Sequence, residues 1–213
     1  MSESHYRRDG FALIPEAVPR EVANGLLARM KVDFSRQKVD LGQLRKPGPL
    51  LVQPAVEIYG YHYPMFATFH WGLTSLVQQY AGVPLLPTYC YFRIYRAGDL
   101  CKVHGDRPAC EHSMSLTLGY ADDKIWPLEV ARQAIAEPYA RADLAFTATE
   151  EAVAVPMVPG DAVLYQGVHH HHGRTTPNPN RWSAHLFLHW VERDGKFADE
   201  AFDKQPPPPT VEF

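Results

Sequence analysis

The stretches TYCYFRIY at residues 88–95 and SMSLTLGY at residues 113–120 decide the fold class of this chain. Both are rich in β-branched and aromatic side chains in an alternating pattern, which is typical of strands. Shorter stretches of the same kind follow at residues 152–158, 162–165 and 184–191, separated by Pro, Gly and Asn. A succession of short strands and frequent turns predicts a β-sandwich or jelly roll.

The part of the chain before residue 88 has a different pattern. Residues 10–14 predict a short edge strand, because Pro15 stops ladder pairing there. Apolar residues recur every three or four positions over residues 20–37 and again over 67–80, which predicts two amphipathic helices. A Pro- and Gly-rich loop is expected between them at residues 39–54, and an inserted helix at residues 130–140. The fold is therefore predicted to be mainly β with N-terminal helices (α+β), packed on one sheet.

The length of 213 residues is typical of one domain. Within it, residues 1–87 are expected to be a helical support, 88–193 a jelly-roll core and 194–213 a tail. The tail contains QPPPPT, which predicts an extended polyproline segment.

The composition excludes several classes of protein. With 46% hydrophobic and 21% charged residues, the chain is typical of a soluble globular protein. The net charge is 21 − 24 = −3, so no basic field is available to bind nucleic acid or an anionic membrane. The sequence shows no membrane span or signal peptide, and its three cysteines are too few for a disulfide framework. These features predict a cytoplasmic protein with reduced thiols.

The motif His104-Gly105-Asp106 carries the first indication of chemistry. In an extended chain, side chains two residues apart project to the same side, so the imidazole and the carboxylate converge. A third ligand from the run at residues 169–172, which is four histidines, would complete the facial triad of a non-heme Fe(II) centre. Alternatively, a short HxD motif is a solvated pair and any one of the four histidines belongs to a polar loop.

Arg181 is the candidate anchor for a carboxylate ligand, since a guanidinium binds a carboxylate through two parallel hydrogen bonds. If Arg181 faces the iron, it would hold the far carboxylate of 2-oxoglutarate. The alternative is a salt bridge on the surface.

Four segments together resemble a known family. YRAGDLCKVHGDRPACEHS at 95–113, WPLEV at 126–130, PGDAVLYQGVHHHHGR at 159–174 and RWSAHLFLHW at 181–190 are similar to the Fe(II)- and 2-oxoglutarate-dependent dioxygenases of the prolyl-hydroxylase-like and phytanoyl-hydroxylase-like branches. The resemblance covers roughly residues 89–190, and GFALIPEAVPREVANGLL at 10–27 resembles the start of many such enzymes. It implies a double-stranded β-helix, the jelly roll of the cupin-like proteins.

The resemblance also implies roles for individual residues. His104, Asp106 and His172 would bind iron, with His171 as an alternative third ligand because the spacing to Arg181 is nine or ten residues in the family. Arg181 would bind the C5 carboxylate of 2-oxoglutarate.

Four further assignments concern the surroundings of this expected site. Ser183 would support the binding of the carboxylate by Arg181, and Tyr95 would donate to 2-oxoglutarate unless it is an ordinary core tyrosine. Arg107 and Glu111 are expected to form a structural ion pair beside the site, and Cys110 to be a small buried residue.

The implied activity is hydroxylation of an unactivated C–H bond with Fe(II), 2-oxoglutarate as cosubstrate and O₂, and with release of succinate and CO₂. A small-molecule or amino-acid-like substrate is expected, because no docking surface for a macromolecule is apparent. Two alternatives use the same ligands: a zinc-dependent hydrolase and a non-catalytic metal-binding jelly-roll protein. An arginine that binds a carboxylate would distinguish the oxygenase from the non-catalytic protein, since a purely structural metal site needs no such arginine. The sequence predicts no oligomeric state.

Overall fold

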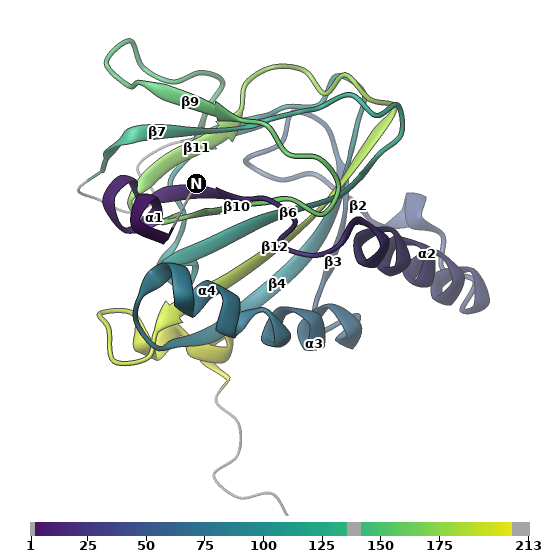
Figure 1. Ribbon diagram of the computed structural model, residues 1–213. Coiled ribbons are helices and arrows are strands. Elements are labelled where there is room, and N and C mark those ends of the chain that lie inside the picture. Colours follow the sequence, from purple (N-terminus) through teal and green to yellow (C-terminus); the bar gives the residue numbers. More distant parts are fainter. Residues whose placement is uncertain (1–2, 136–141, 206–213) are drawn as a thin grey trace, which may run out of the picture.

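The computed structural model describes residues 3–135 and 142–205. Its strands form two antiparallel sheets that face each other, and helices cover the outer side of the larger sheet (Figure 1). The fold class predicted from the sequence, a mainly β jelly roll with N-terminal helices, is confirmed. The assignment of all 213 residues to one domain stays a prediction.

The larger sheet has seven strands in the spatial order β1-β10-β6-β12-β4-β3-β2. The strands are β1 (Phe11–Ile14), β2 (Arg45–Lys46), β3 (Ala55–Tyr59), β4 (Leu85–Arg96), β6 (His112–Tyr120), β10 (Ala162–Tyr165) and β12 (Trp182–Glu192). The strand expected at residues 10–14 is β1, and it lies at an edge as predicted.

The smaller sheet has five strands in the order β8-β5-β11-β7-β9. The strands are β5 (Cys101–His104), β7 (Leu128–Ala134), β8 (Ala142–Asp143), β9 (Ala152–Val155) and β11 (His170–Arg174). Because β5 and β11 are neighbours, His172 lies directly opposite His104 in the ladder. This register brings the HxD motif to the histidine run.

The helices are α1 (Glu3–Asp9), α2 (Arg20–Arg36), α3 (Pro64–Gly72) and α4 (Thr74–Ala81), and the short 3₁₀ helices are η1 (Leu41–Leu44), η2 (Pro108–Cys110) and η3 (Ala198–Lys204). The helix expected at 67–80 is in fact two helices that meet at Leu73. Of the helices described, none is both long and apolar enough to cross a membrane.

Alternation along β12 separates the core from the space between the sheets. Leu186 and Leu188 pack in the main core with the helices. Phe187 and His189 point the other way and line a cavity between the sheets. One strand thus supports the hydrophobic core on one face and a polar site on the other.

The prediction of an inserted helix at residues 130–140 is wrong for residues 130–135, the part that the structure describes. Leu128–Ala134 is strand β7, which pairs with β11 on one side and β9 on the other. Leu128 and Val130 are buried, and the backbone bonds made to two neighbouring strands outweigh the helical propensity of this segment. Residues 136–140 and the QPPPPT tail beyond residue 205 lie outside the described residues.

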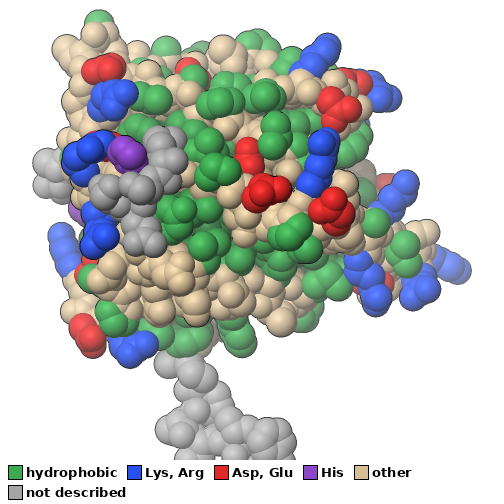
Figure 2. Space-filling model, in the orientation of Figure 1, with side chains coloured by type: hydrophobic (Ala, Val, Ile, Leu, Met, Phe, Trp, Pro, Cys, Tyr) green, Lys and Arg blue, Asp and Glu red, His purple; other side chains and the backbone are tan. Residues whose placement is uncertain are grey.

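The surface carries both signs of charge. Figure 2 shows basic side chains in separate groups on this face, with acidic side chains between them.

Candidate metal centre

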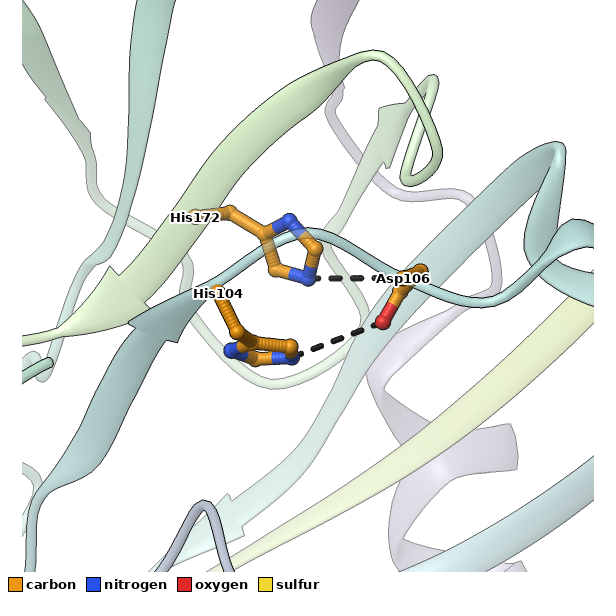
Figure 3. Close-up of side chains that lie close together, drawn as sticks. All are labelled: His104, Asp106 and His172. Carbon is orange, nitrogen blue, oxygen red and sulfur yellow. Dashed lines mark ion pairs between the residues drawn. The ribbon is translucent and has the colours of Figure 1, made fainter. Parts of the chain in front are cut away.

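The structure brings His104, Asp106 and His172 together between the two sheets (Figure 3). His104 Nε2 lies 3.4 Å from Asp106 Oδ1, and His172 Nε2 lies 3.5 Å from Asp106 Oδ2. Neighbouring ligand atoms of an octahedral ion with bonds of about 2.1 Å lie about 3 Å apart. Small side-chain movements therefore suffice to place the three ligands on one face of an octahedron.

The backbone orients both imidazoles. His104 Nδ1 donates to the carbonyl oxygen of Lys102 at 2.7 Å, and His172 Nδ1 donates to that of His170 at 2.9 Å. Because a carbonyl only accepts, each Nδ1 carries a proton. The other ring nitrogen, Nε2, faces Asp106 in both residues. This is the arrangement in which a neutral imidazole offers its Nε2 lone pair to a metal.

The carboxylate of Asp106 is held by its surroundings. The backbone N–H of Asp106 donates to the carbonyl of Gly167 at 2.8 Å, and the Ser113 hydroxyl lies 3.3 Å from Oδ2. Ser113 Oγ also lies 2.8 Å from Nδ1 of His189. The Asp106 side chain is thus held by the turn after β10 and by the inner faces of β6 and β12.

The electrostatics of the three groups are coupled. Burial lowers the pKa of His104, but the hydrogen bond and charge of Asp106 outweigh this and raise the pKa to about 9. Burial lowers the pKa of His172 to about 4 against the opposing effect of Asp106. Burial raises the pKa of Asp106, yet the two imidazoles hold it well below its usual range. Asp106 is therefore a carboxylate in this site.

The four histidines of the run lie in different surroundings. His172 faces Asp106, whereas His171 Nδ1 forms a hydrogen bond with the carboxylate of Glu150. His170 Nδ1 donates to the carbonyl of Ala131 at 2.9 Å. The structure brings His172, and not its alternative His171, to the HxD motif.

A cavity of about 520 Å³ opens beside the three residues. Several aromatic and basic side chains share its wall with His104, Asp106 and His172. They are Tyr59, Tyr89, Tyr91, Arg93, Arg107, Tyr165, Arg174, Phe187 and His189. The stretch TYCYFRIY supplies three of these from alternate positions of β4, a signal that the sequence already contained.

Arg174 is a buried arginine that forms no ion pair with the residues of 3–135 and 142–205. It follows His172 by two residues on β11, lines the same cavity and is fully buried. Its Nε and Nη1 have no hydrogen-bond partner in the described part of the chain, and its Nη2 lies 3.3 Å from the Ser115 hydroxyl. The guanidinium lies over the ring of Trp126, 5.0 Å from the centroid. A buried charge of this kind is costly unless an anion pairs with it.

Two of the predicted cosubstrate residues are buried but have protein partners. The Tyr95 hydroxyl accepts from Arg93 Nη1 at 2.9 Å, and the Ser183 hydroxyl accepts from Asn178 Nδ2 at 3.1 Å. Neither Tyr95 nor Ser183 is among the residues that line the cavity. Arg93 does line it, but its charge is already paired with Glu57 at 2.5 Å.

The structure does not bring Arg181 to the metal centre, which corrects the expected geometry. The Arg181 side chain is 77% exposed and its Nε donates to Asp122 Oδ1 at 2.8 Å. Arg181 precedes β12 at the far end of the strand and borders a different pocket, on the α2 side of the sheet. The surface salt bridge, which was the alternative interpretation, describes this residue.

The expected ion pair between Arg107 and Glu111 is also not formed. Arg107 Nη2 donates to Asp203 Oδ1 at 2.7 Å, and Glu111 accepts from the backbone N–H of Glu192 at 2.8 Å. The two side chains leave η2 in different directions, because Arg107 precedes and Glu111 follows this single turn. Cys110 is buried, as predicted.

Solved structures share the fold of this chain. The non-heme α-ketoglutarate-dependent carbocyclase SnoK of nogalamycin biosynthesis has a TM-score of 0.68 and 14% identity, over 90% of this chain and 83% of that one. A Pseudomonas putida prolyl-4-hydroxylase has a TM-score of 0.61 and 16% identity, over 91% and 97%. The epimerase SnoN, in complex with Fe³⁺, α-ketoglutarate and nogalamycin RO, has a TM-score of 0.59 and 15% identity, over 99% and 92%.

The chain matches no protein-family model, and no curated protein matches it in sequence. The likeness at these low identities is a likeness of fold: the jelly roll of the α-ketoglutarate-dependent non-heme enzymes. That fold is the one which the sequence resemblance implied.

Proposed function

We propose that this chain is an Fe(II)- and 2-oxoglutarate-dependent oxygenase that hydroxylates a C–H bond of a small molecule. One observation carries the proposal: the His104, Asp106 and His172 side chains and the unpaired guanidinium of Arg174 line one cavity. The first three suit a metal with open positions, and Arg174 suits a carboxylate.

The donor set fits ferrous iron. Two imidazoles and one carboxylate on one face leave three positions open, which are needed when a bidentate keto acid and dioxygen bind together. Iron with 2-oxoglutarate and O₂ would insert one oxygen atom into a C–H bond, while the second enters succinate and CO₂ is released. The residues of this chain would hold the metal, orient the cosubstrate and exclude water.

Arg174 fits the far carboxylate of 2-oxoglutarate. Residues two apart on a strand are about 6.6 to 6.8 Å apart, so Arg174 stands beside His172 at a distance comparable to an extended five-carbon diacid. Arg93, the other buried arginine of the cavity, is already neutralised by Glu57. We therefore assign the anchor to Arg174 in place of Arg181. Tyr95, which lies beneath the guanidinium at 5.9 Å, would support it by packing.

The substrate side of the cavity is aromatic. Tyr91 stacks on Phe187 with ring centroids 4.8 Å apart, and Tyr59 lies 5.5 Å from Tyr91. Such a wall favours a small molecule with a flat or apolar part. SnoN, which shares the fold, is known in complex with nogalamycin RO.

The unpaired Arg174 also weighs against the two alternatives. A metal that only stabilises the fold needs no buried cation beside it, and a zinc-activated water would need a general base near the metal. His189 lies near Asp106 and its Nδ1 bonds with Ser113, but burial lowers the pKa of His189 to about 4, so this imidazole is a weak base.

An anaerobic titration tests the proposal. Protein loaded with Fe(II) should develop a weak visible metal-to-ligand band when 2-oxoglutarate is added, and should release succinate when oxygen is admitted. His172→Ala should abolish both signals. The matched control His171→Ala should keep them, because His171 contacts Glu150 and not the metal ligands. Zinc-loaded protein that turns over a substrate without oxygen or 2-oxoglutarate would establish the hydrolase instead.

A further inference from the structure

A second group of possible metal ligands lies where β6 begins and β12 ends. Glu111 directly follows η2, His112 opens β6 and Glu192 closes β12. The two strands are neighbours, with His112 opposite Trp190. One ligand atom from each of the three residues lies within 4.8 Å of the others.

This cluster is separate from the candidate iron centre. Along β6, Met114 and Leu116 share the face of His112 and pack in the core beneath the helices. Ser113 points to the opposite face, where it contacts Asp106. The His112 cluster therefore lies on the helix side of the seven-stranded sheet, and the iron centre lies on the inner side.

His112 presents an unsatisfied nitrogen to the two carboxylates. Its side chain is only 5% exposed, and its Nδ1 forms a 2.6 Å hydrogen bond with the Tyr6 hydroxyl of α1. Its Nε2 has no hydrogen-bond partner among the residues that the structure describes, and it lies 3.7 Å from Glu192 Oε1. A buried ring nitrogen without a partner is costly, so its direction towards two carboxylates calls for a ligand.

The charge of the cluster calls for a cation. Glu111, His112 and Glu192 bring two carboxyl groups and one imidazole together, and Glu111 also accepts from the backbone N–H of Glu192 at 2.8 Å. Among the ion pairs of the described residues, none joins Glu111 or Glu192 to a lysine or arginine. Two carboxylates and one imidazole match the charge and donor preference of a divalent transition metal.

We propose that Glu111, His112 and Glu192 bind a second divalent metal ion, of which Zn²⁺ is the best match. Tetrahedral ligands about 2.0 to 2.2 Å from zinc lie roughly 3.3 to 3.6 Å apart, close to the separation of His112 and Glu192. The ion would join the ends of two central strands and, through Tyr6, would fix α1. A water would complete the four ligands, and the ion would stabilise the fold without taking part in the oxygenase activity.

The test uses a variant that lacks the candidate iron centre. His104→Ala combined with Asp106→Ala removes two of its ligands, and this protein should still bind one Zn²⁺ per chain in a calorimetric titration. Adding Glu192→Gln, which keeps the size of a half-exposed side chain, should abolish that binding. His112→Gln should do the same. Glu151→Gln is the control, because Glu151 is an exposed carboxylate that pairs with Arg132.

The result separates a built site from incidental binding to surface histidines. Zinc should raise the melting temperature of the iron-site variant and of its Glu151→Gln derivative, and should leave the Glu192→Gln derivative unchanged. If the iron-site variant binds no zinc, or if Glu192→Gln and His112→Gln bind it as well as Glu151→Gln does, the proposal is wrong. Melting curves recorded with a chelator establish that each variant is folded.

Discussion

Two arginines of the same cavity differ in one respect that decides their roles. Arg93 is paired with Glu57 and donates to the Tyr95 hydroxyl, so its charge and hydrogen bonds are satisfied by the protein. Arg174 is even more deeply buried, at 0% exposed against 7% for Arg93, yet two of its nitrogens have no hydrogen-bond partner among the described residues. Removing the partner of a buried charge typically costs about 3 to 5 kcal/mol, and a bound carboxylate would recover that free energy. An anion that pairs with Arg174 should therefore bind favourably to the ligand-free protein.

Replacing Arg174 should weaken the binding of 2-oxoglutarate without lowering the melting temperature of the protein. Arg174→Met keeps the length of the side chain but removes the charge, so 2-oxoglutarate should bind more weakly by about 2 to 5 kcal/mol, roughly 30-fold or more. The melting temperature of the ligand-free protein should not fall, because an uncompensated charge is replaced by an apolar side chain. Titration of the Fe(II) protein with 2-oxoglutarate measures the first effect and thermal unfolding the second.

Arg181 supplies the control for this prediction. Arg181→Ala removes a side chain that is 77% exposed and paired with Asp122, so the affinity for 2-oxoglutarate should stay within a factor of about 3 of the parent. Arg174→Lys should restore only part of the binding, since an ammonium cannot form two parallel bonds with a carboxylate. Strong loss in Arg181→Ala with normal binding in Arg174→Met would reverse the assignment.

The turn between β10 and β11 lies against the carboxylate of Asp106, the proposed metal ligand. A Cβ atom on Gly167 would lie 2.2 Å from Asp106 Oδ2 and 2.9 Å from the carbonyl oxygen of Cys110. The backbone carbonyl cannot give way, whereas the carboxylate can rotate. Glycine is thus needed here for the close approach of the turn to Asp106, which also donates its N–H to the Gly167 carbonyl.

Gly167→Ala should consequently weaken metal binding without removing any ligand. Displacing the carboxylate should lower the affinity for Fe(II) by about 10- to 100-fold, as is typical when the support of a metal ligand is disturbed. Gly25→Ala is the matched control, because no atom lies within 4 Å of its added Cβ on helix α2. That control should stabilise the protein by about 0.5 to 1 kcal/mol and leave metal binding unchanged. Equal metal affinity in the two variants would refute the proposed support.

The contrast between His172 and Arg181 shows what the sequence can predict. Strand periodicity and the HxD motif suffice to place His104 and Asp106 on one side, and the predicted strand in GDAVLYQG places the histidine run directly after it. The separate strand β11, which pairs His172 with His104, was not predicted. The alternation rule applied to His172 also predicts that Arg174 shares its face. Arg181 was assigned by family spacing instead. Whether an arginine before a strand faces the cavity depends on the residue at which that strand begins. For β12, pairing with β4 and β6 determines this residue.

The helix expected at residues 130–140 was wrong for a related reason. Residues 128–134 contain good helix formers, but they lie between two strands that are distant in sequence. Pairing with β11 and β9 decides their structure. Helical propensity depends only on the local sequence, so it contains no information about these partners. Tyr59, Tyr91 and Phe187 likewise become one aromatic wall only through the register of three strands.

The two sheets lie on either side of the candidate site and both contribute side chains to it. The smaller sheet contributes His104, His172 and Arg174, whereas the larger sheet contributes the aromatic wall. Bound metal and cosubstrate would therefore connect the two layers, and their binding free energy should appear as resistance to unfolding.

If metal and cosubstrate connect the two sheets, 2-oxoglutarate should raise the melting temperature more when a divalent metal is present than when it is absent. In the presence of Mn²⁺, a divalent substitute for Fe(II), 2-oxoglutarate at 100 times its Kd should stabilise the fold by about 2.7 kcal/mol. For a chain of this length, that corresponds to a rise in melting temperature of roughly 5 to 10 °C. Without a divalent metal, 2-oxoglutarate should give a much smaller rise, because only the contact with Arg174 remains.

Variants show which contact produces the rise. Asp106→Ala should lose the increment that depends on 2-oxoglutarate, even if the metal alone still stabilises the protein at the second site proposed above. Arg174→Met should lose it as well, whereas Arg181→Ala should retain it in full. Differential scanning fluorimetry with succinate as a further ligand completes the test, because succinate offers two carboxylates but no keto oxygen to chelate the metal. A rise with succinate equal to that with 2-oxoglutarate would show that the ligand binds through its carboxylates alone, away from the metal.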